Sequence, residues 1–298
     1  MTLPGFDDGT HAVGDATYFL SQGGAGRPLL LLHGFPETHV CWHRVAPRLA
    51  ETHRVIAPDL RGYGASEAPP GGPRGEGYTK REMAADLVRL MTDLGHRRFA
   101  VVGHNRGARV AYRLALDHPD RVERVAVLNV VPTIDQFERM GGGPSLGYWP
   151  WFLLAQPAPF PERLLLAAPA AVLDEVFASW PSEPSAIGAE QRDAYLRALT
   201  PSTAAAMCGD YRASFYLDRE HEADDRAAAR RLSCQTLTVT GRDETQLADA
   251  DRVWARWAVD LTAERVPGGH FIPEESPDEL SEILTRFLDP AGSHHGGR

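Results

Sequence analysis

The chain has 298 residues, 43% of them hydrophobic, which is enough to bury the core of one large domain. Its formal net charge of −9 argues against a nucleic-acid or anionic-membrane surface, because such surfaces need clustered lysine and arginine. Cys41, Cys208 and Cys234 lie far apart, so we expect neither a disulfide framework nor a zinc site. With no leader or bilayer-spanning stretch expected, we predict a cytoplasmic protein without nucleic-acid or membrane partners.

Apolar runs alternate with helical patterns through the first 132 residues. Strands are predicted at 16–21, 28–32, 54–57, 99–102 and 125–128. Helices are predicted between them at about 40–49, 79–94 and 110–118. Continuously apolar runs are typical of strands covered on both faces, and their alternation with helices predicts an α/β fold with a mostly parallel, doubly wound sheet.

This rhythm stops after Pro132. No further strand is expected from about Thr133 to Ala229, which is rich in aromatic residues and in helix-like stretches, at 161–180 and 190–199. The final predicted elements are strands at 235–240 and 261–266, a helix at 277–288 and a frayed tail at 290–298. We therefore predict an α/β core made of residues 1–132 and 230–298, with residues 133–229 inserted as a helical lid.

The segment Gly103-His104-Asn105-Arg106-Gly107 follows a predicted strand and precedes a predicted helix. Its pattern, G-x-N-x-G, is that of a nucleophile elbow, in which a side chain at either glycine would crowd the neighbouring backbone. Asn105 should therefore stand above the sheet, at the positive end of the following helix. A neutral amide is a poor nucleophile, whereas serine, cysteine or aspartate at this position could attack a substrate.

Asp243 and His270 follow the last two predicted strands. Because ligands of open parallel sheets bind beyond the carboxyl ends of the strands, we expect both side chains near Asn105. Elbow, acid and histidine also occur in the chain order of an α/β-hydrolase. We predict His270 as the base and Asp243 as the acid that holds its tautomer, against the alternatives of a surface histidine and a turn aspartate.

The backbone N–H groups of Phe35 and Arg106 are the expected oxyanion donors. Arg106 and Arg109 begin the elbow helix and could clamp an anion, although Arg109 could equally pair outward. The lid aromatics carry polar hydrogens, but each of them alone is more often part of a core. The candidate substrate contacts are Arg106, Arg109, Trp149, Trp151, Tyr211 and Asn129.

Over nearly its whole length the chain resembles the epoxide hydrolase and haloalkanoate dehalogenase branch of the α/β-hydrolases. The segments that carry this resemblance are 31–38, 59–66, 103–109 and 268–271, and a closer likeness to fluoroacetate dehalogenases lies in 116–120, 127–133 and 156–159. In this family an elbow aspartate attacks carbon to form an ester, and a histidine then activates the water that hydrolyses it. The resemblance implies oxyanion donors at Phe35 and Arg106, a carboxylate clamp of Arg106 and Arg109, and lid donors at Trp151 and Tyr211.

Three positions depart from the family pattern. Asn105 replaces the aspartate. Asn129 stands where fluoroacetate dehalogenases carry the acid of the histidine, and Asp243 stands where most other α/β-hydrolases carry it. Pro150 replaces a histidine of the halide pocket, which weakens fluoride release, so epoxide opening is favoured over defluorination.

The asparagine leaves several functions open. With an engineered Asn105, the chain would be a substrate-trapping form of an epoxide hydrolase or of a haloacetate dehalogenase. With a native asparagine, it would be a non-covalent acid–base enzyme or a ligand-binding protein. In each case we expect a small-molecule substrate with an oxygen-rich end and an apolar part, no cofactor and no metal, and a cleft roomier than a haloacetate needs. A homodimer is left open.

Overall fold

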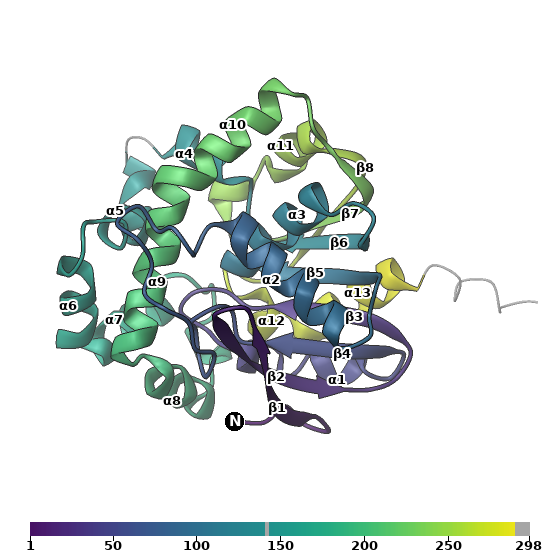
Figure 1. The fold of residues 1–298 in the computed structure, drawn as a ribbon, viewed down its shortest axis with the longest axis horizontal. Helices are drawn as coiled ribbons and strands as arrows, with labels where there is room; N and C mark the ends of the chain where they lie inside the picture. The colour runs from purple at the N-terminus through teal and green to yellow at the C-terminus, as the bar shows by residue number, and fades with distance from the viewer. Residues whose placement is uncertain (141–142, 290–298) are drawn as a thin grey trace, which may run out of the picture.

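The computed structural model describes residues 1–140 and 143–289, so the predicted frayed tail at 290–298 lies outside the described residues. Its centre is one sheet with the strand order β1-β2-β4-β3-β5-β6-β7-β8 (Figure 1). The strands are β1 Asp7–Val13, β2 Ala16–Gly23, β3 Arg27–Leu32, β4 His53–Pro58, β5 Phe99–His104, β6 Val122–Leu128, β7 Leu232–Gly241 and β8 Ala258–Val266. β1 and β2 run antiparallel and β3 to β8 run parallel, which confirms the predicted mostly parallel sheet.

Continuous apolar runs predicted the central strands β3, β5 and β6. Leu29 to Leu32 in β3 and the whole of β5 are buried, because helices cover both faces of the sheet. β1 escaped prediction because it is an edge strand whose residues are mostly exposed and therefore need no apolar pattern.

Helices of the core lie on both faces of the sheet (Figure 1). They are η1 His39–Trp42, α1 Ala46–Leu49, α2 Lys80–Asp93, α3 Arg106–Asp117, η5 Thr245–Leu247, α11 Ala250–Trp257, α12 Ile272–Glu275 and α13 Pro277–Leu288. α2 begins after Thr79, which caps the helix and forms a reciprocal capping box with Glu82. The helix predicted at 40–49 is instead two short pieces, η1 and α1.

All the elements described between β6 and β7 are helical, and they stand together on one side of the sheet (Figure 1). They are α4 Thr133–Arg139, η2 Gly143–Tyr148, α5 Trp149–Leu153, α6 Phe160–Ala167, α7 Pro169–Ser179, η3 Pro184–Ala186, α8 Ala189–Ala198, α9 Pro201–Ala213, η4 Ser214–Asp218 and α10 Arg219–Ala227. The single helix predicted at 161–180 is broken between α6 and α7, because Pro169 disfavours helical backbone at Ala168. We keep the name lid for residues 133–229.

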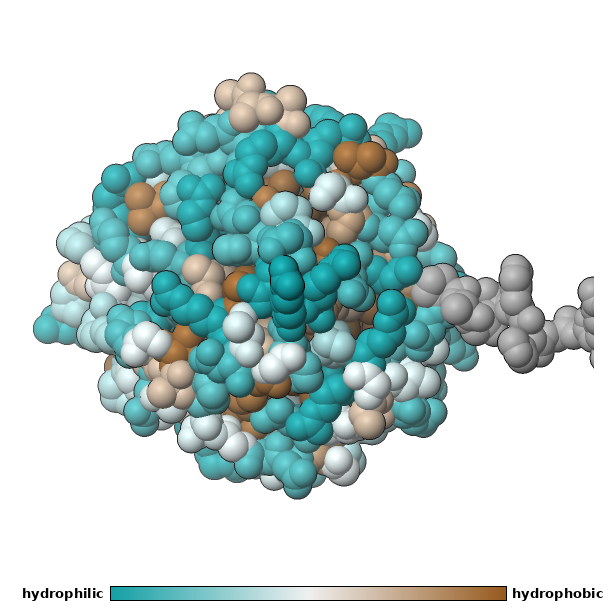
Figure 2. All heavy atoms as spheres, turned by 45° about the vertical axis from the view of Figure 1, so that its right-hand side comes forward, coloured by the Kyte–Doolittle hydropathy of each residue, from teal (hydrophilic) through white to brown (hydrophobic). Residues whose placement is uncertain are grey.

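Most of the molecular face in Figure 2 is hydrophilic, and its hydrophobic residues form small separate groups. Within residues 1–140 and 143–289, no helix combines the length and the apolar character needed to cross a membrane. The same residues contain no group of three or more histidine, cysteine or acidic side chains arranged to hold a metal ion.

Candidate active site

The elbow is a tight turn between β5 and α3, and Asn105 at its tip has φ 48° and ψ −113°. This is a strained backbone conformation for a residue other than glycine. A side chain at Gly103 would collide with the Gly107 carbonyl, and one at Gly107 would collide with the backbone of Leu32 and His33. Gly103 is therefore required by the tightness of the elbow itself, and Gly107 by its close approach to the end of β3.

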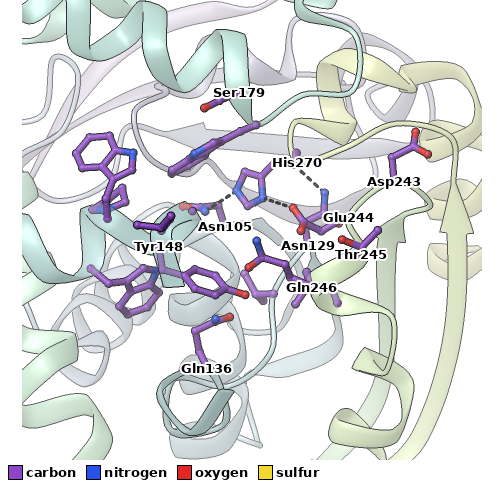
Figure 3. A pocket seen from close by; sticks show the side chains of 18 of the residues that line it. Asn105, Asn129, Gln136, Tyr148, Ser179, Asp243, Glu244, Thr245, Gln246 and His270 are labelled. Atoms are coloured by element: carbon purple, nitrogen blue, oxygen red, sulfur yellow. Dashed lines mark hydrogen bonds and ion pairs between the residues drawn. The ribbon is translucent and has the colours of Figure 1, made fainter. Parts of the chain in front are cut away.

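The Asn105 amide is held at both of its ends. Its Oδ1 accepts hydrogen bonds from the backbone N–H groups of Phe35, at 3.1 Å, and Arg106, at 2.7 Å. Its Nδ2 lies 2.7 Å from Nε2 of His270 (Figure 3). The structure thus brings together the predicted elbow residue, oxyanion donors and base. Since Nδ2 can only donate, Nε2 of His270 accepts and the ring proton lies on Nδ1.

The acid that faces His270 is Glu244, whose Oε2 lies 3.3 Å from Nδ1. The predicted pairing of His270 with Asp243 is therefore corrected. Asp243 is exposed, and Figure 3 shows its side chain turned away from the ring. The two acids are consecutive in the turn after β7, where the Asp243 N–H bonds to Gly268 O, and the longer Glu244 reaches back to the histidine.

Asn129 supports the histidine loop. Its Nδ2 donates to the carbonyls of Gly269, at 2.8 Å, and His270, at 2.7 Å, and its Oδ1 accepts from Gly241 N, at 2.8 Å. Its amide, which follows β6, is therefore occupied by one backbone group at the end of β7 and two in the loop after β8. Asn129 also lines the cavity between core and lid, so its contact with substrate stays a prediction.

A second support, Glu275, was missed in the sequence. Its carboxylate accepts from the N–H groups of Gly269 and Phe271, both at 2.8 Å, on either side of His270. It also accepts from the N–H and the hydroxyl of Ser182 in the lid, at 2.8 and 2.9 Å. His270 N in turn donates to the carbonyl of Trp180, at 3.1 Å. Glu275 therefore joins the histidine loop to the lid.

His104 was also missed, although it lies inside the elbow. Its Nε2 lies 2.8 Å from the His270 carbonyl, and its Nδ1 lies 2.9 Å from Oε2 of Glu37. The side chains of His104 and Glu37 are fully buried. Burial, and then the nearby Glu37 carboxylate, raise the pKa of the Glu274 carboxyl well above its ordinary value. The signal in the sequence was the occurrence of two polar side chains, Glu37 and His104, within otherwise apolar motifs.

The two arginines of the elbow helix differ in their partners. Arg106 donates through Nε and Nη2 to the two carboxylate oxygens of Asp210, each at 2.8 Å. Burial alone would lower the pKa of this guanidinium, but the Asp210 carboxylate outweighs burial and raises it. Nη1 of Arg106 is buried without a hydrogen-bond partner among the described residues.

Arg109 has no carboxylate partner within residues 1–140 and 143–289, although its exposed fraction is 3%. Its Nη1 donates to the Val131 carbonyl, at 2.9 Å, and to the Thr133 hydroxyl, at 3.2 Å. Burial lowers the pKa of its guanidinium, whose ordinary value is high enough for the charge to remain. Among the described residues the cavity wall therefore contains a buried cation with no acid at ion-pair distance, and the Glu222 carboxylate acts on it only from farther away.

Asn105, Arg109 and His270 open into a cavity of about 370 Å³ between the core and the lid. The cavity is lined by the three lid aromatics that the sequence analysis gave as candidate substrate contacts, Trp149, Trp151 and Tyr211. The Trp151 ring stacks over both guanidinium groups, with its centroid 4.9 Å from Arg106 Cζ and 4.6 Å from Arg109 Cζ. Burial raises the pKa of the Tyr211 hydroxyl, which therefore stays protonated and able to donate at neutral pH.

A family model described as alpha/beta hydrolase fold matches residues 27–277. A fluoroacetate dehalogenase from Burkholderia sp is 39% identical over 97% of this chain and 96% of its own length. A soluble epoxide hydrolase from Corynebacterium sp. (strain C12) is 31% identical, covering 90% of this chain and 92% of its own.

Solved structures agree with this fold. A candidate α/β hydrolase from Nostoc sp PCC 7120 is similar at a TM-score of 0.92 and 40% identity, covering 95% of this chain and 98% of its own. A variant of a candidate epoxide hydrolase from Pseudomonas aeruginosa, with bound MFA, has the same TM-score and identity and covers 98% and 99%. The matched family model, the relatives and the strand order together show that this chain belongs to the α/β hydrolase family, as its motifs predicted.

Proposed function

We propose that this site, with aspartate at position 105, hydrolyses 2-haloacids, and that the chain with Asn105 binds these acids without turning them over. The observation that carries the proposal is Arg109, a buried cation in the cavity wall without an acidic partner in the described chain. A substrate carboxylate would supply that partner, since arginine binds carboxylates with charge-assisted hydrogen bonds. The 39% identity to a fluoroacetate dehalogenase supports the same substrate class.

The reaction would proceed in two steps. First, a carboxylate oxygen of residue 105 forms a bond to C2 of the substrate while the carbon–halogen bond breaks and halide leaves. The indole N–H of Trp151 and the hydroxyl of Tyr211 line the cavity and are suited to receive that halide. Second, Nε2 of His270 takes a proton from water, and the hydroxide attacks the carbonyl carbon of the ester.

The hydrogen bonds of Asn105 support the second step. Its Oδ1 accepts hydrogen bonds from Phe35 N and Arg106 N. The same two donors would stabilise the oxyanion that forms on the ester carbonyl oxygen when hydroxide adds to give the tetrahedral intermediate. Glu244 would stabilise the cation that forms on His270. Collapse of the tetrahedral intermediate then breaks its bond to the substrate oxygen, restores the carboxylate and releases the 2-hydroxyacid, and His270 gives its proton to solvent. Asn105 cannot begin this sequence, because the lone pair of its nitrogen is delocalised into the carbonyl.

Epoxide opening is the second candidate, and it was the one favoured from the sequence. Trp151 and Tyr211 could donate to an epoxide oxygen as well as to a halide. Pro150 lines the cavity where the resemblance expects a histidine of the halide pocket. We place this reaction second because an epoxide without a carboxylate leaves Arg109 unpaired.

The test is Asn105→Asp, assayed with chloroacetate, bromoacetate and styrene oxide, with the unaltered chain as the control and intact mass verifying residue 105. We expect halide release from the acids by the aspartate form alone. Turnover of styrene oxide without halide release would establish the second candidate. Turnover that survives Asn105→Ala and is lost with His270→Ala would establish a non-covalent acid–base enzyme instead.

A further inference from the structure

The cavity is larger than a haloacetate requires. A haloacetate has five non-hydrogen atoms, which occupy at most roughly 150 Å³ if each takes the volume of one water molecule, about 30 Å³. The cavity measures about 370 Å³. The space left over, roughly 220 Å³, would hold about seven further atoms at the same volume each. An acid whose carboxylate meets Arg109 and whose C2 meets residue 105 therefore leaves room for a second substituent on C2.

The inner wall of this remaining space is apolar and aromatic. Val130 and Leu247, both from the core, are 2% and 4% exposed. The lid adds Tyr148 and Trp149, at the start of α5, and Trp180, which follows α7, and all three are half-buried. The Trp180 ring meets the His270 ring edge to face, with the two centroids 5.1 Å apart. The apolar wall therefore begins beside the catalytic histidine.

Polar side chains that take no part in the proposed chemistry lie at the mouth of the cavity. Glu175, Ser179, Asp243 and Thr245 belong to the lining, but each of them is exposed. Because they remain in contact with solvent, they need no partner from a ligand. They therefore mark where the cavity opens and do not contribute to its inner wall.

The two amides of the lining are not free to bind a ligand. The side chain of Gln136 is hydrogen-bonded to the hydroxyl of Tyr148, and Oε1 of Gln246 is buried. Tyr148 thus has its polar atom engaged by the protein, and its ring is what remains for a ligand. The inner space consequently offers packing surface and few hydrogen bonds.

Such a wall selects for an apolar substituent. A polar group placed against it would lose its hydration without gaining a partner, and a second carboxylate would also lie on the side of Glu244. An apolar ring would leave water without that penalty and could pack against Trp149 and Trp180. We propose that the substrate is a 2-haloacid whose C2 carries an apolar group of about the size of a benzyl group, and this inference rests on the proposed function.

The test compares two secondary bromides in the Asn105→Asp protein. 2-Bromopropanoate carries a methyl group on C2, and 2-bromo-3-phenylpropanoate carries a benzyl group. We expect kcat/KM, measured for the faster enantiomer of each acid, to be higher for the benzyl acid by at least about tenfold, which corresponds to about 1.4 kcal/mol. Equal values, or a preference for the methyl acid, would overturn the subsite and leave the proposed function standing.

Trp149→Ala should lower the ratio of benzyl to methyl turnover, because it removes part of the apolar wall. The matched control is Phe152→Ala, since Phe152 lies on the same helix, is 41% exposed and is not part of the cavity lining. The control should keep the ratio. Leu247→Ala tests the wall from the core side if Trp149→Ala does not fold. A ratio that stays the same in a folded wall variant would overturn the subsite.

Binding to the unaltered chain, measured by calorimetry, separates the two claims when no acid is turned over. Tighter binding of 2-bromo-3-phenylpropanoate than of 2-bromopropanoate would then support the subsite although the proposed function had failed. Equal binding of the two acids would overturn the subsite.

Discussion

Replacing Glu275 by glutamine should displace the His270 side chain but leave the shape of the cavity unchanged. The carboxylate accepts four hydrogen bonds, of which three converge on Oε2 and one, from Phe271 N, reaches Oε1. A glutamine keeps the shape but has a single oxygen, so at least one backbone N–H must face its NH₂ group. The least costly orientation keeps the three bonds at the Oε2 position and leaves Phe271 N unpaired.

The cost follows from that geometry. Losing one hydrogen bond to a charged group and leaving its donor unpaired costs about 2–3 kcal/mol. For a chain of 298 residues each kcal/mol lowers Tm by roughly 1.6 °C, so we expect Glu275→Gln to unfold about 3–5 °C below the parent. Because the unpaired group is adjacent to His270, we also expect kcat in the Asn105→Asp background to fall by about tenfold or more, since small displacements of catalytic groups are expensive. KM should change little, since Glu275 is not part of the cavity lining.

The assay combines a thermal melt with halide-release kinetics, and Glu279→Gln is the control because Glu279 is an exposed acid on the adjacent helix α13. A lower Tm with unchanged kcat would mean that Glu275 only stabilises the fold. An unchanged Tm would refute the hydrogen-bond reasoning altogether.

The remaining predictions concern the arginines, a buried acid and the halide pocket. Arg106→Met should lower the free energy of unfolding by about 3–5 kcal/mol, because it leaves a buried carboxylate without its partner. Arg109→Met should change the free energy of unfolding by less than about 1 kcal/mol but raise KM for haloacids at least about tenfold in the Asn105→Asp background. Urea melts and kinetics test both variants, and equal destabilisation by the two would contradict these expectations. The pKa of Glu274 is raised on folding, so the stability that this group contributes is lost as pH rises above its unfolded value of about 4.3. Glu274→Gln should therefore gain stability over the parent between pH 5 and pH 8 in urea melts, and a gain that shrinks with pH would reverse the sign we assign. Pro150→His in the Asn105→Asp background should raise the ratio of fluoroacetate to chloroacetate turnover, and an unchanged ratio would separate this position from the halide pocket.

The sequence alone was enough to predict the fold class, because strands, helices and the elbow each depend on residues that are close together in the chain. Apolar runs without alternation mark strands buried on both faces, and the two glycines of the elbow mark a turn that only they can make. The comparisons confirm the fold class and the family that these patterns predicted. The exceptions were an edge strand, which needs no apolar run, the helix predicted at 40–49, which is two short pieces, and the helix that Pro169 interrupts.

Tertiary structure decided which polar groups meet. Asp243 and Glu244 follow the same strand, and only the path of the turn after β7 makes Glu244 the acid that faces His270. Arg106 and Arg109 share a helix, yet Asp210, about one hundred residues away in sequence, neutralises only the first. Composition and periodicity identify such side chains as polar residues near strand ends. Their partners depend on distances set by the packing of lid against core, and those distances have no local signature in the sequence.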